Sequence, residues 1–420
     1  MPSVTITIFY FVLCSVVLFK LPFIKKAKLG NTIVTLLFAL KCLAGVAYAR
    51  FYQLPKYYST ADTWRFYKLS LDEKQWLLHN PYAFVKDIFT HGYQQTGNVF
   101  IGSNSYWNDL KSNIIIKLMA LFNVLTADGY YSNLVLFNLL YFVGLIALYR
   151  VFISLYPTAK WAAIIGIFLF PSTLFWCSGI HKDGLVLSAV GVAIFCFHFK
   201  IVQKPFNLKA ILLILACFAL TFVLRSYVLL ALLPFLLGWW VSKQINWPPI
   251  RIFTMLYLAG VVLFFALPYI SSGLNFPGFL ANKQHEFLLL SGGSAVSALP
   301  LQPTFTGFLI YLPTALDMAL FQPHLTAGFN VGALLAFGEQ ILIVLLLAAF
   351  WLAKKPAQQL PVITGMLFFG ISVLLIAGYS VTFSGAVVRY RSFVIPFLLT
   401  PLLCSIDVQK LIKSLSPKTN

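Results

Sequence analysis

The sequence predicts an all-α, polytopic membrane protein with about eleven transmembrane helices and interfacial helices in its outer loops. Three observations predict this class. Of the 420 residues, 60% are hydrophobic and only 10% are charged, whereas a soluble domain needs about a quarter of its residues charged. The mean hydropathy is +0.87. The 41 Phe, 20 Tyr and 9 Trp residues suit lipid-facing surfaces and interfacial aromatic belts.

Each predicted span is a stretch of about 20 mostly apolar residues, the length that crosses a bilayer. The spans cover residues 4–22, 31–51, 130–150, 161–178, 184–200, 208–224, 226–242, 251–271, 331–353, 361–381 and 391–407. Two further stretches, 114–126 and 306–321, stay open between interfacial and re-entrant helices, and we expect 114–126 not to cross. The whole chain, 1–420, is therefore predicted as one integral membrane domain.

Basic residues set the expected orientation. Lysines gather within residues 20–28 and at 354–355, and Arg150 and Lys160 flank another short loop. With 114–126 not crossing, these loops share one face, which the positive-inside rule makes cytoplasmic. The N-terminus is then expected outside and the C-terminus in the cytoplasm.

This orientation leaves two long segments outside, 52–129 and 272–330. Most of the acidic residues fall on the same face: Asp62, Asp72, Glu73, Asp87, Asp109, Asp128, Asp183, Glu286 and Asp317. The cytoplasmic loops are too short to form a domain. We therefore expect any chemistry to take place on the outer side.

Several function classes are disfavoured by the motifs and charges of the chain. No Walker A, dinucleotide fingerprint, HExxH or GxSxG motif stands in a suitable context, which argues against ATP-driven transport, metalloproteolysis and serine hydrolysis. The net charge of +19 comes mostly from short loops, so it indicates orientation in a bilayer rather than nucleic-acid binding. The six cysteines lie in or beside apolar runs without metal-type spacing, which is typical of small buried hydrophobes.

The first candidate site is ADTWRFYKLS (61–70), which follows the second predicted span. Asp62 precedes Tyr67 by five residues, and both have basic neighbours. A carboxylate at the membrane surface, among apolar helices and cations, suits a general base for a sugar hydroxyl. The structural alternative is that Asp62 only caps the start of a helix.

The second candidate site is PSTLFWCSGIHKDGLVLSAVG (171–191), where His181, Lys182 and Asp183 interrupt a hairpin of two apolar helices. Three ionisable residues at such a turn are costly unless they are paired or wet, so a functional site is the first hypothesis. The structural alternative is that Asp183 only favours the dipole of the helix that it opens.

Arginines form the third candidate site. Arg389 and Arg391 lie in GAVVRYRSFVIPFLL (385–399), at the outer end of the last predicted span, and Arg225 lies in LRSYVLL (224–230) on the same face. Outer arginines oppose the orientation signal, which favours a role. A guanidinium binds phosphate oxygens through paired donors and keeps its charge, so these three are predicted to bind substrate phosphate.

Two further positions stand out. Lys41 lies deep in the second span and Glu339 inside a later one, so a buried Lys41–Glu339 pair that fixes helix packing is predicted. Proton-coupled transport through that pair is the alternative. His324 follows Gln322 and Pro323 at the outer surface, where this segment is expected to shape a lipid or acceptor entrance.

Together these features resemble the GT-C superfamily of membrane glycosyltransferases, of the type that acts in bacterial surface-polysaccharide biosynthesis. The resemblance is carried by ADTWRFY (61–67), FWCSGIHKDG (175–184) and RYRSFVIP (389–396), and the pattern of spans and loops covers most of the chain. Two features depart from the superfamily. The acidic loop follows the second span instead of the first, and Asp62 has no second acid beside it, which leaves a metal requirement open.

The resemblance implies transfer of a sugar from a polyprenyl-phosphate-linked donor to a glycan or lipid acceptor, on the outer face of the bacterial cytoplasmic membrane. It implies that Asp62 activates the acceptor hydroxyl and that Arg389 and Arg391 hold the donor phosphate. No counterpart is assigned to His181, Lys182 and Asp183, and Tyr67 and Arg225 are expected to contact substrate. A divalent cation stays open as a cofactor. No nucleotide cofactor is implied, because the lipid carries the donor.

Two other classes stay open. An O-antigen-type polysaccharide polymerase or ligase also has many spans and uses lipid-linked sugars, but such enzymes tend to place arginines in the large outer loop, and 272–330 holds Lys283 and no Arg. A transporter or flippase of lipid-linked sugars would show an inverted repeat and polar residues at mid-membrane depth. The sequence shows no such repeat.

Overall fold

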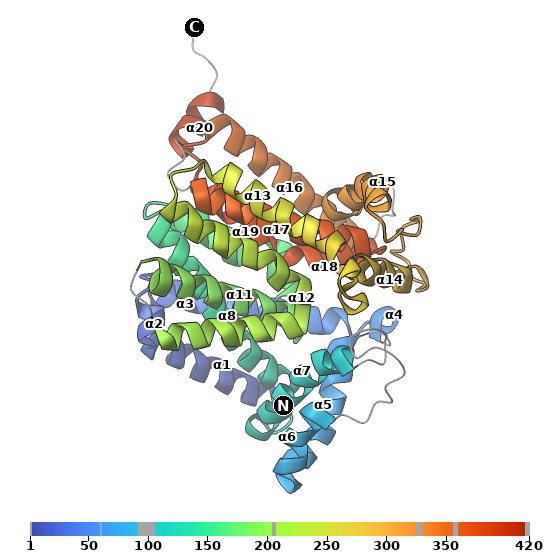
Figure 1. The fold of residues 1–420 in the computed structure, drawn as a ribbon. Coiled ribbons are helices and arrows are strands. Elements are labelled where there is room, and N and C mark those ends of the chain that lie inside the picture. Colours follow the sequence, from blue (N-terminus) through green and yellow to red (C-terminus); the bar gives the residue numbers. More distant parts are fainter. Residues whose placement is uncertain are drawn as a thin grey trace. The chain divides into compact units, whose positions relative to one another are not determined.

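The computed structural model describes residues 2–58, 61–90, 106–203, 207–324, 331–355 and 360–415, which fold mainly as helices (Figure 1). Within these residues the extended pairings are two isolated bridges, Ala295 with Phe383 and Lys354 with Ile406. The all-α prediction is therefore confirmed for the described part of the chain.

Seven helices among the described residues are long and apolar enough to cross a membrane. They are α3 (Asn31–Phe51), α8 (Tyr130–Leu155), α11 (Lys182–Phe197) with the π-helical turn His198–Val202, α12 (Leu208–Gln244), α13 (Pro249–Ala266) with the 3-10 turn Leu267–Tyr269, α16 (Val331–Ala353) and α17 (Leu360–Ser380). The pair α18 (Ser384–Ser392) and α19 (Ile395–Cys404), bent by 55°, makes an eighth if it is counted as one span. The chain is thus a polytopic helical membrane protein.

The difference from the expected number of spans has identifiable origins. The stretches predicted at 208–224 and 226–242 join in α12, which leaves helical geometry at Arg225 (φ −153°, ψ 76°). That break lies where the sequence predicts the boundary between two spans. The first predicted span is a shorter apolar helix, Val4–Lys20 within α1 (Pro2–Lys20).

The prediction of one continuous helix over 161–178 is wrong. Helix α9 (Lys160–Ile164) continues as a π-helical turn (Ile165–Leu169), and then Phe170 becomes extended (φ −63°, ψ 125°). A new short helix, α10 (Pro171–Trp176), follows. Proline has no N–H to donate and restricts the residue before it to extended geometry, so Pro171 separates the two pieces.

The chain divides into two compact units. The first contains Met1–Arg150 and Thr173–Ser226, and the second contains Val151–Ser172 and Tyr227–Asn420. Asp62, His181, Asp183 and Arg225 all belong to the first unit, and Glu339, Arg389 and Arg391 belong to the second.

Glycines bring α8 and α11 of the first unit into close contact. A Cβ added at Gly144 would collide with the backbone of Ser188, and one added at Gly191 would lie 2.5 Å from the carbonyl oxygen of Gly144. Because interiors are packed to crystal-like density, such an approach tolerates no added methyl group without a shift. The first unit therefore holds its two most buried helices backbone to backbone.

Arg150 marks one end of the first unit. Its guanidinium donates to the carbonyl of Phe23, just after α1 in the short helix α2 (Pro22–Lys25), at 3.3 Å. It also lies over the rings of Phe195 and Phe199 near the end of α11, at 4.7 and 5.7 Å from the ring centres. The lysine-rich segment 20–28 therefore lies at the end of the unit where α8 and α11 finish, and Asp183 lies where α11 begins.

Three helices that are not candidate spans follow the short helix α4 (Pro55–Tyr58): α5 (Asp62–His79), α6 (Pro81–Thr90) and α7 (Tyr106–Thr126). The stretch 114–126 forms the second half of α7, which packs on α5. Buried polar bonds join the two helices, with Lys117 2.8 Å from Glu73 and Asn123 donating to Ser70 at 2.9 Å. Such polar packing explains why this stretch is not an apolar span.

The second unit has a core built around α13, α15 (Phe305–Leu316), α17 and α19. Phe308, Tyr311 and Ala315 of α15 form one buried cluster with Leu301 and with Ala281 of α14 (Phe276–Leu288). The stretch 306–321 is α15 followed by a π-helical turn, Asp317–Phe321, and counts as a shorter apolar helix. The 3-10 turn Ser272–Leu274 precedes α14, and α20 (Val408–Leu415) ends the described chain.

Candidate active site

Asp62 is the first residue of α5 and does not act as its cap. The capping position is Ala61 (φ −80°, ψ 95°), which offers no side-chain hydrogen bond. The side chain of Asp62 is 43% exposed, and its Oδ2 lies 3.6 Å from Nε2 of His181. The alternative that Asp62 only caps a helix is therefore wrong. Its carboxylate faces both solvent and a buried imidazole.

His181 lies at the turn before α11 and is 1% exposed. Its backbone is extended (φ −157°, ψ 163°), which directs the side chain away from the helix that begins at Lys182. Nδ1 of the ring lies 3.0 Å from Oδ2 of Asp183. Because a carboxylate only accepts, Nδ1 carries the hydrogen of this bond, and Nε2 is the nitrogen that faces Asp62.

Asp183 is fully buried, with 0% exposure, and its charge is met by Arg225. Nε of Arg225 donates to Oδ1 of Asp183 at 2.8 Å, and Nη2 donates to the same oxygen. A buried carboxylate stays ionised only when a counter-charge and hydrogen bonds replace water. The helix break at Arg225 therefore places a cation where Asp183 needs one.

The four side chains form one ordered series: Asp62, His181, Asp183 and Arg225. The outer carboxylate contacts solvent, the imidazole lies between two carboxylates, and the guanidinium holds the inner one. An imidazole oriented by one carboxylate can accept a proton at its other nitrogen, which is the arrangement of general-base dyads and triads. The residues predicted separately from three sequence segments are thus brought together.

Three residues that the sequence interpretation did not assign to this site support the turn that carries His181. Asn138 donates to the carbonyl of Ser178 at 2.8 Å, and the hydroxyl of Tyr141 donates to the carbonyl of His181 at 3.1 Å. Lys41 donates to the carbonyl of Cys177 at 2.7 Å and to Oγ of Ser178 at 3.1 Å. Polar residues in the otherwise apolar stretch 130–150 were the signal that could have indicated Asn138 and Tyr141.

The predicted Lys41–Glu339 pair is wrong. Lys41 binds the turn of Cys177 and Ser178, as above, while Glu339 accepts hydrogen bonds from the backbone N–H and the hydroxyl of Ser172 at 2.8 and 2.6 Å. The last carbonyls of a helix and its first N–H groups have no partner within the helix. The ammonium of Lys41 accordingly binds the carbonyl of Cys177 just after α10, and the carboxylate of Glu339 binds the N–H of Ser172 at the start of α10. Each buried charge therefore has local backbone partners.

Tyr67 lies one turn further along α5 and supports that helix. Its hydroxyl donates to the carbonyl of Asp128 at 2.6 Å. Burial, and then the negative charge of Asp128, raise the pKa of the Tyr67 hydroxyl. On the same helix Trp64 stacks on Tyr130 with ring centres 4.0 Å apart, and Thr63 bonds the Tyr130 hydroxyl at 2.6 Å. These contacts fix α5, and hence Asp62, against the start of α8.

The two late arginines of the second unit lie in α18 and differ in environment. Arg391 is 4% exposed, and its Nη1 donates to the carbonyls of Leu320 and Gln322 at 3.4 and 3.3 Å. Arg389 is half-buried. Residues two apart on a helix point about 200° apart, so the two guanidinium groups do not face one ligand side by side.

His324 and Asp317 form an exposed pair in the second unit. Nε2 of His324 lies 3.0 Å from Oδ1 of Asp317, and both side chains are well exposed. In the first unit, Lys182 stands between the buried residues His181 and Asp183 and is itself half-buried. Within the described ranges no group of three or more His, Cys, Asp or Glu side chains is placed to hold a metal ion.

Comparison with known proteins adds no assignment. Neither a protein-family model, nor a curated protein, nor a solved structure matches this chain.

Proposed function

We propose that this chain is a membrane glycosyltransferase that moves a sugar from a polyprenyl-phosphate-linked donor to an acceptor hydroxyl on the extracytoplasmic face. Asp62, backed by His181, is proposed as the base that removes the acceptor proton. The single observation that carries this proposal is a half-exposed carboxylate, Asp62, whose Oδ2 lies 3.6 Å from the buried imidazole of His181, with Asp183 and Arg225 behind it.

The position of the cluster supports chemistry at a membrane surface. Asp62 begins a helix outside the candidate spans, while His181 and Asp183 lie at the start of the apolar helix α11. The basic segment near Arg150 lies where that helix ends. Under the positive-inside rule the basic end is cytoplasmic, so the cluster would face outside, where lipid-linked sugars are used.

The proposed step balances as follows. The acceptor oxygen forms a bond to the anomeric carbon of the donor sugar, and the bond from that carbon to the lipid phosphate breaks, with its electron pair leaving on the phosphate. The acceptor proton passes to Asp62 and then to Nε2 of His181. The resulting imidazolium lies between the carboxylates of Asp62 and Asp183.

The donor phosphate needs cations of its own, because negative charge develops on it as the bond breaks. The arginines predicted for this role, Arg389 and Arg391, belong to the second unit, and the guanidinium of Arg391 donates to the carbonyls of Leu320 and Gln322. Lys182, at the start of α11, is proposed as a further contact to substrate.

The proposal is tested by transfer in proteoliposomes. The purified protein is supplied with polyprenyl-phosphate-linked glucose, galactose or N-acetylglucosamine, labelled in the sugar, and with cell-envelope glycan as acceptor. Wild type and the exposed-site control Glu286→Gln should transfer label, and Asp62→Asn should lose transfer by about 10²–10⁴-fold. Transfer by Asp62→Asn at the wild-type rate would overturn the proposal.

The proposed location has its own test. A reporter fused after Asp183 should indicate the extracytoplasmic side, and one fused within the lysine-rich segment 20–28 should indicate the cytoplasm. The reverse pattern would place the cluster where lipid-linked donors are not used.

A transporter or flippase of lipid-linked sugars is the second candidate. It is favoured by the fully buried Asp183–Arg225 pair, since ionisable pairs inside a helical bundle often mark transport pathways. The same proteoliposomes separate the two functions. A transporter would move labelled lipid-linked sugar across the bilayer without adding sugar to the glycan.

A further inference from the structure

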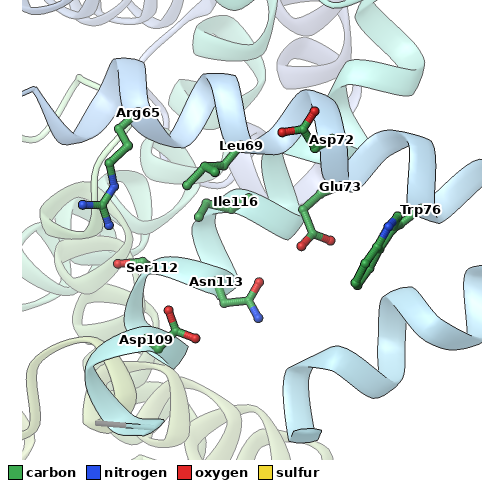
Figure 2. A pocket seen from close by; sticks show the side chains of 9 residues that line it. All are labelled: Arg65, Leu69, Asp72, Glu73, Trp76, Asp109, Ser112, Asn113 and Ile116. Carbon is green, nitrogen blue, oxygen red and sulfur yellow. The ribbon is translucent and has the colours of Figure 1, made fainter. Parts of the chain in front are cut away.

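The first unit contains a cavity whose lining includes none of the residues of the His181 cluster. It is a cavity of about 280 Å³ between α5 and α7, near the lower end of the size of small-molecule sites. Figure 2 shows Arg65 and Glu73 extending from α5 toward α7, and Trp76 extending from the same side of α5 beside Glu73. From α7, Asp109, Ser112 and Asn113 meet them.

The lining has the chemistry of a sugar site. A guanidinium and an amide offer donors, and carboxylates, the amide oxygen and a hydroxyl offer acceptors, which matches hydroxyl groups that both donate and accept. Trp76 is 51% exposed at the same wall. An exposed indole is costly to leave in water, and it offers a flat apolar surface for the C–H face of a sugar ring.

The charged residues that line the cavity between α5 and α7 indicate which kinds of ligand it can bind. Among the lining residues that the structure describes, Arg65 is the one cation, whereas Asp72, Glu73 and Asp109 are carboxylates. This balance disfavours phosphate, sulfate and acidic sugars through like-charge repulsion. Among the described residues these carboxylates do not converge as a metal site either. A neutral carbohydrate remains the ligand that fits.

Two of the polar groups are held in place from behind. Lys117, nearly buried, lies 2.8 Å from Oε2 of Glu73 and 2.9 Å from Oδ2 of Asp87. Asn113 donates its amide to the same Asp87 oxygen at 3.1 Å, so its amide oxygen is oriented as well. Fixed acceptors lose little freedom when a ligand binds, which is how a preorganised site gains affinity.

Two other polar groups at the wall are not engaged by the protein. The side chains of Arg65 and Asp72 make no hydrogen bond or ion pair to the described part of the chain, and both residues are exposed. The guanidinium of Arg65 is then available to a ligand without breaking an internal contact, whereas Figure 2 shows the Asp72 carboxylate turned away from Ser112 and Asn113.

Helix geometry links the cavity to the candidate base. Asp62, Arg65, Glu73 and Trp76 are spaced by three, eight and three residues, which keeps all four within about a quarter of the circumference of α5. Arg65 is about 4.5 Å further along the helix axis than Asp62, and Trp76 about 21 Å. An extended glycan lying along this face would reach from Trp76 to the base.

We propose that the cavity between α5 and α7 binds a neutral glycan acceptor and presents its terminal hydroxyl to Asp62. This inference rests on the proposed glycosyltransferase function for the role of the glycan as acceptor. The inference requires that neutral carbohydrate binds at Trp76 whether or not the chain is a glycosyltransferase.

The test is carbohydrate binding by the purified full chain in lipid nanodiscs, measured by saturation-transfer NMR on a panel of short neutral oligosaccharides of glucose, galactose, mannose and N-acetylglucosamine. Wild type should bind at least one member through its ring C–H protons. Trp76→Ala should weaken that binding by at least about tenfold, because a stacking anchor is lost, and Asp72→Asn should weaken it less. Trp247→Ala is the matched control, since Trp247 is 48% exposed in the loop between α12 and α13, and it should bind as wild type does.

Failure of this inference and failure of the proposed function give different results. Asp62→Asn should bind the oligosaccharide within about twofold of wild type while it loses transfer. No binding to any member of the panel by wild type, or equal binding by Trp76→Ala, overturns the glycan site. Normal transfer by Asp62→Asn together with Trp76-dependent binding overturns the proposed base and leaves the glycan site standing.

Discussion

Arg225 donates from Nε and Nη2 to a single carboxylate oxygen, Oδ1 of Asp183, and the second oxygen of that carboxylate orients His181. The carboxylate is fully buried, so bulk solvent does not reach it. One arginine at a helix break therefore determines whether the inner carboxylate can remain ionised and hold the imidazole.

Removing Arg225 should destabilise the first unit strongly. Arg225→Ala removes the guanidinium that faces the buried carboxylate of Asp183, at a cost of about 3–5 kcal/mol, whereas the double variant Asp183→Leu/Arg225→Met should lose much less. Unfolding in mixed detergent micelles measures both. The exposed pair Lys283–Glu286, with side chains 52% and 42% exposed, is the control, and Lys283→Ala should change stability by less than about 1 kcal/mol. Equal losses for Arg225→Ala and Lys283→Ala would contradict this account.

Replacing His181 should slow transfer without weakening acceptor binding. Glutamine keeps hydrogen-bonding groups at similar positions but cannot hold a proton, so His181→Gln should lower kcat by about 10²–10⁴-fold and leave the KM for acceptor nearly unchanged. Steady-state transfer kinetics separate the two constants.

A double variant of Asp62 and His181 tests whether the two side chains act together in proton transfer. If Asp62 and His181 act as one unit, the double variant Asp62→Asn/His181→Gln should be no slower than the worse single variant. Multiplied losses would indicate that the two side chains act independently.

Lys41 should act on the turn before His181 and not on Glu339. Lys41→Met removes the donor to Cys177 and Ser178 and should cost about 1–3 kcal/mol, because a buried carbonyl loses its partner. Combined with Glu339→Gln in a double-mutant cycle, the losses should add within about 0.5 kcal/mol. A larger coupling energy would show that the two charges interact directly after all.

The contact between α8 and α11 should tolerate no methyl group. Gly144→Ala places a Cβ against the backbone of Ser188 and should destabilise the protein by about 1–3 kcal/mol. Gly260 in α13 is the matched control, since nothing lies within 4 Å of a Cβ added there. Gly260→Ala should be neutral or stabilise by up to about 1 kcal/mol. The midpoint temperatures of thermal unfolding of the two variants test this prediction. An unchanged midpoint for Gly144→Ala would mean that α8 and α11 can move apart without loss of stability.

Much of the candidate site could be predicted from the sequence because ionisable residues are rare in apolar helices. Asp62, His181, Asp183 and Arg225 stand out against apolar surroundings, and the structure brings all four together. The helix break at Arg225 was also predictable, since a polar residue separates two apolar runs of span length.

The partner that each buried charge binds could not be predicted from the sequence in the same way. Charge alone suggested that Lys41 meets Glu339, but a buried ammonium is satisfied equally by carbonyls, and sequence spacing does not reveal which backbone groups a turn leaves free. The cavity between α5 and α7 depends on how two amphipathic helices pack across many residues of chain. Its members, such as Trp76 and Asn113, look like ordinary surface residues in the sequence.

The buried series that begins at Asp62 also has a consequence for electroneutrality. With a neutral ring at His181, these four side chains comprise two carboxylates and one guanidinium, so their own formal charges sum to about −1. When the ring takes a proton, positive and negative charges are equal. A medium of low polarisability penalises excess charge, so the transfer of the acceptor proton to the ring brings the charges of the cluster closer to balance during the proposed step.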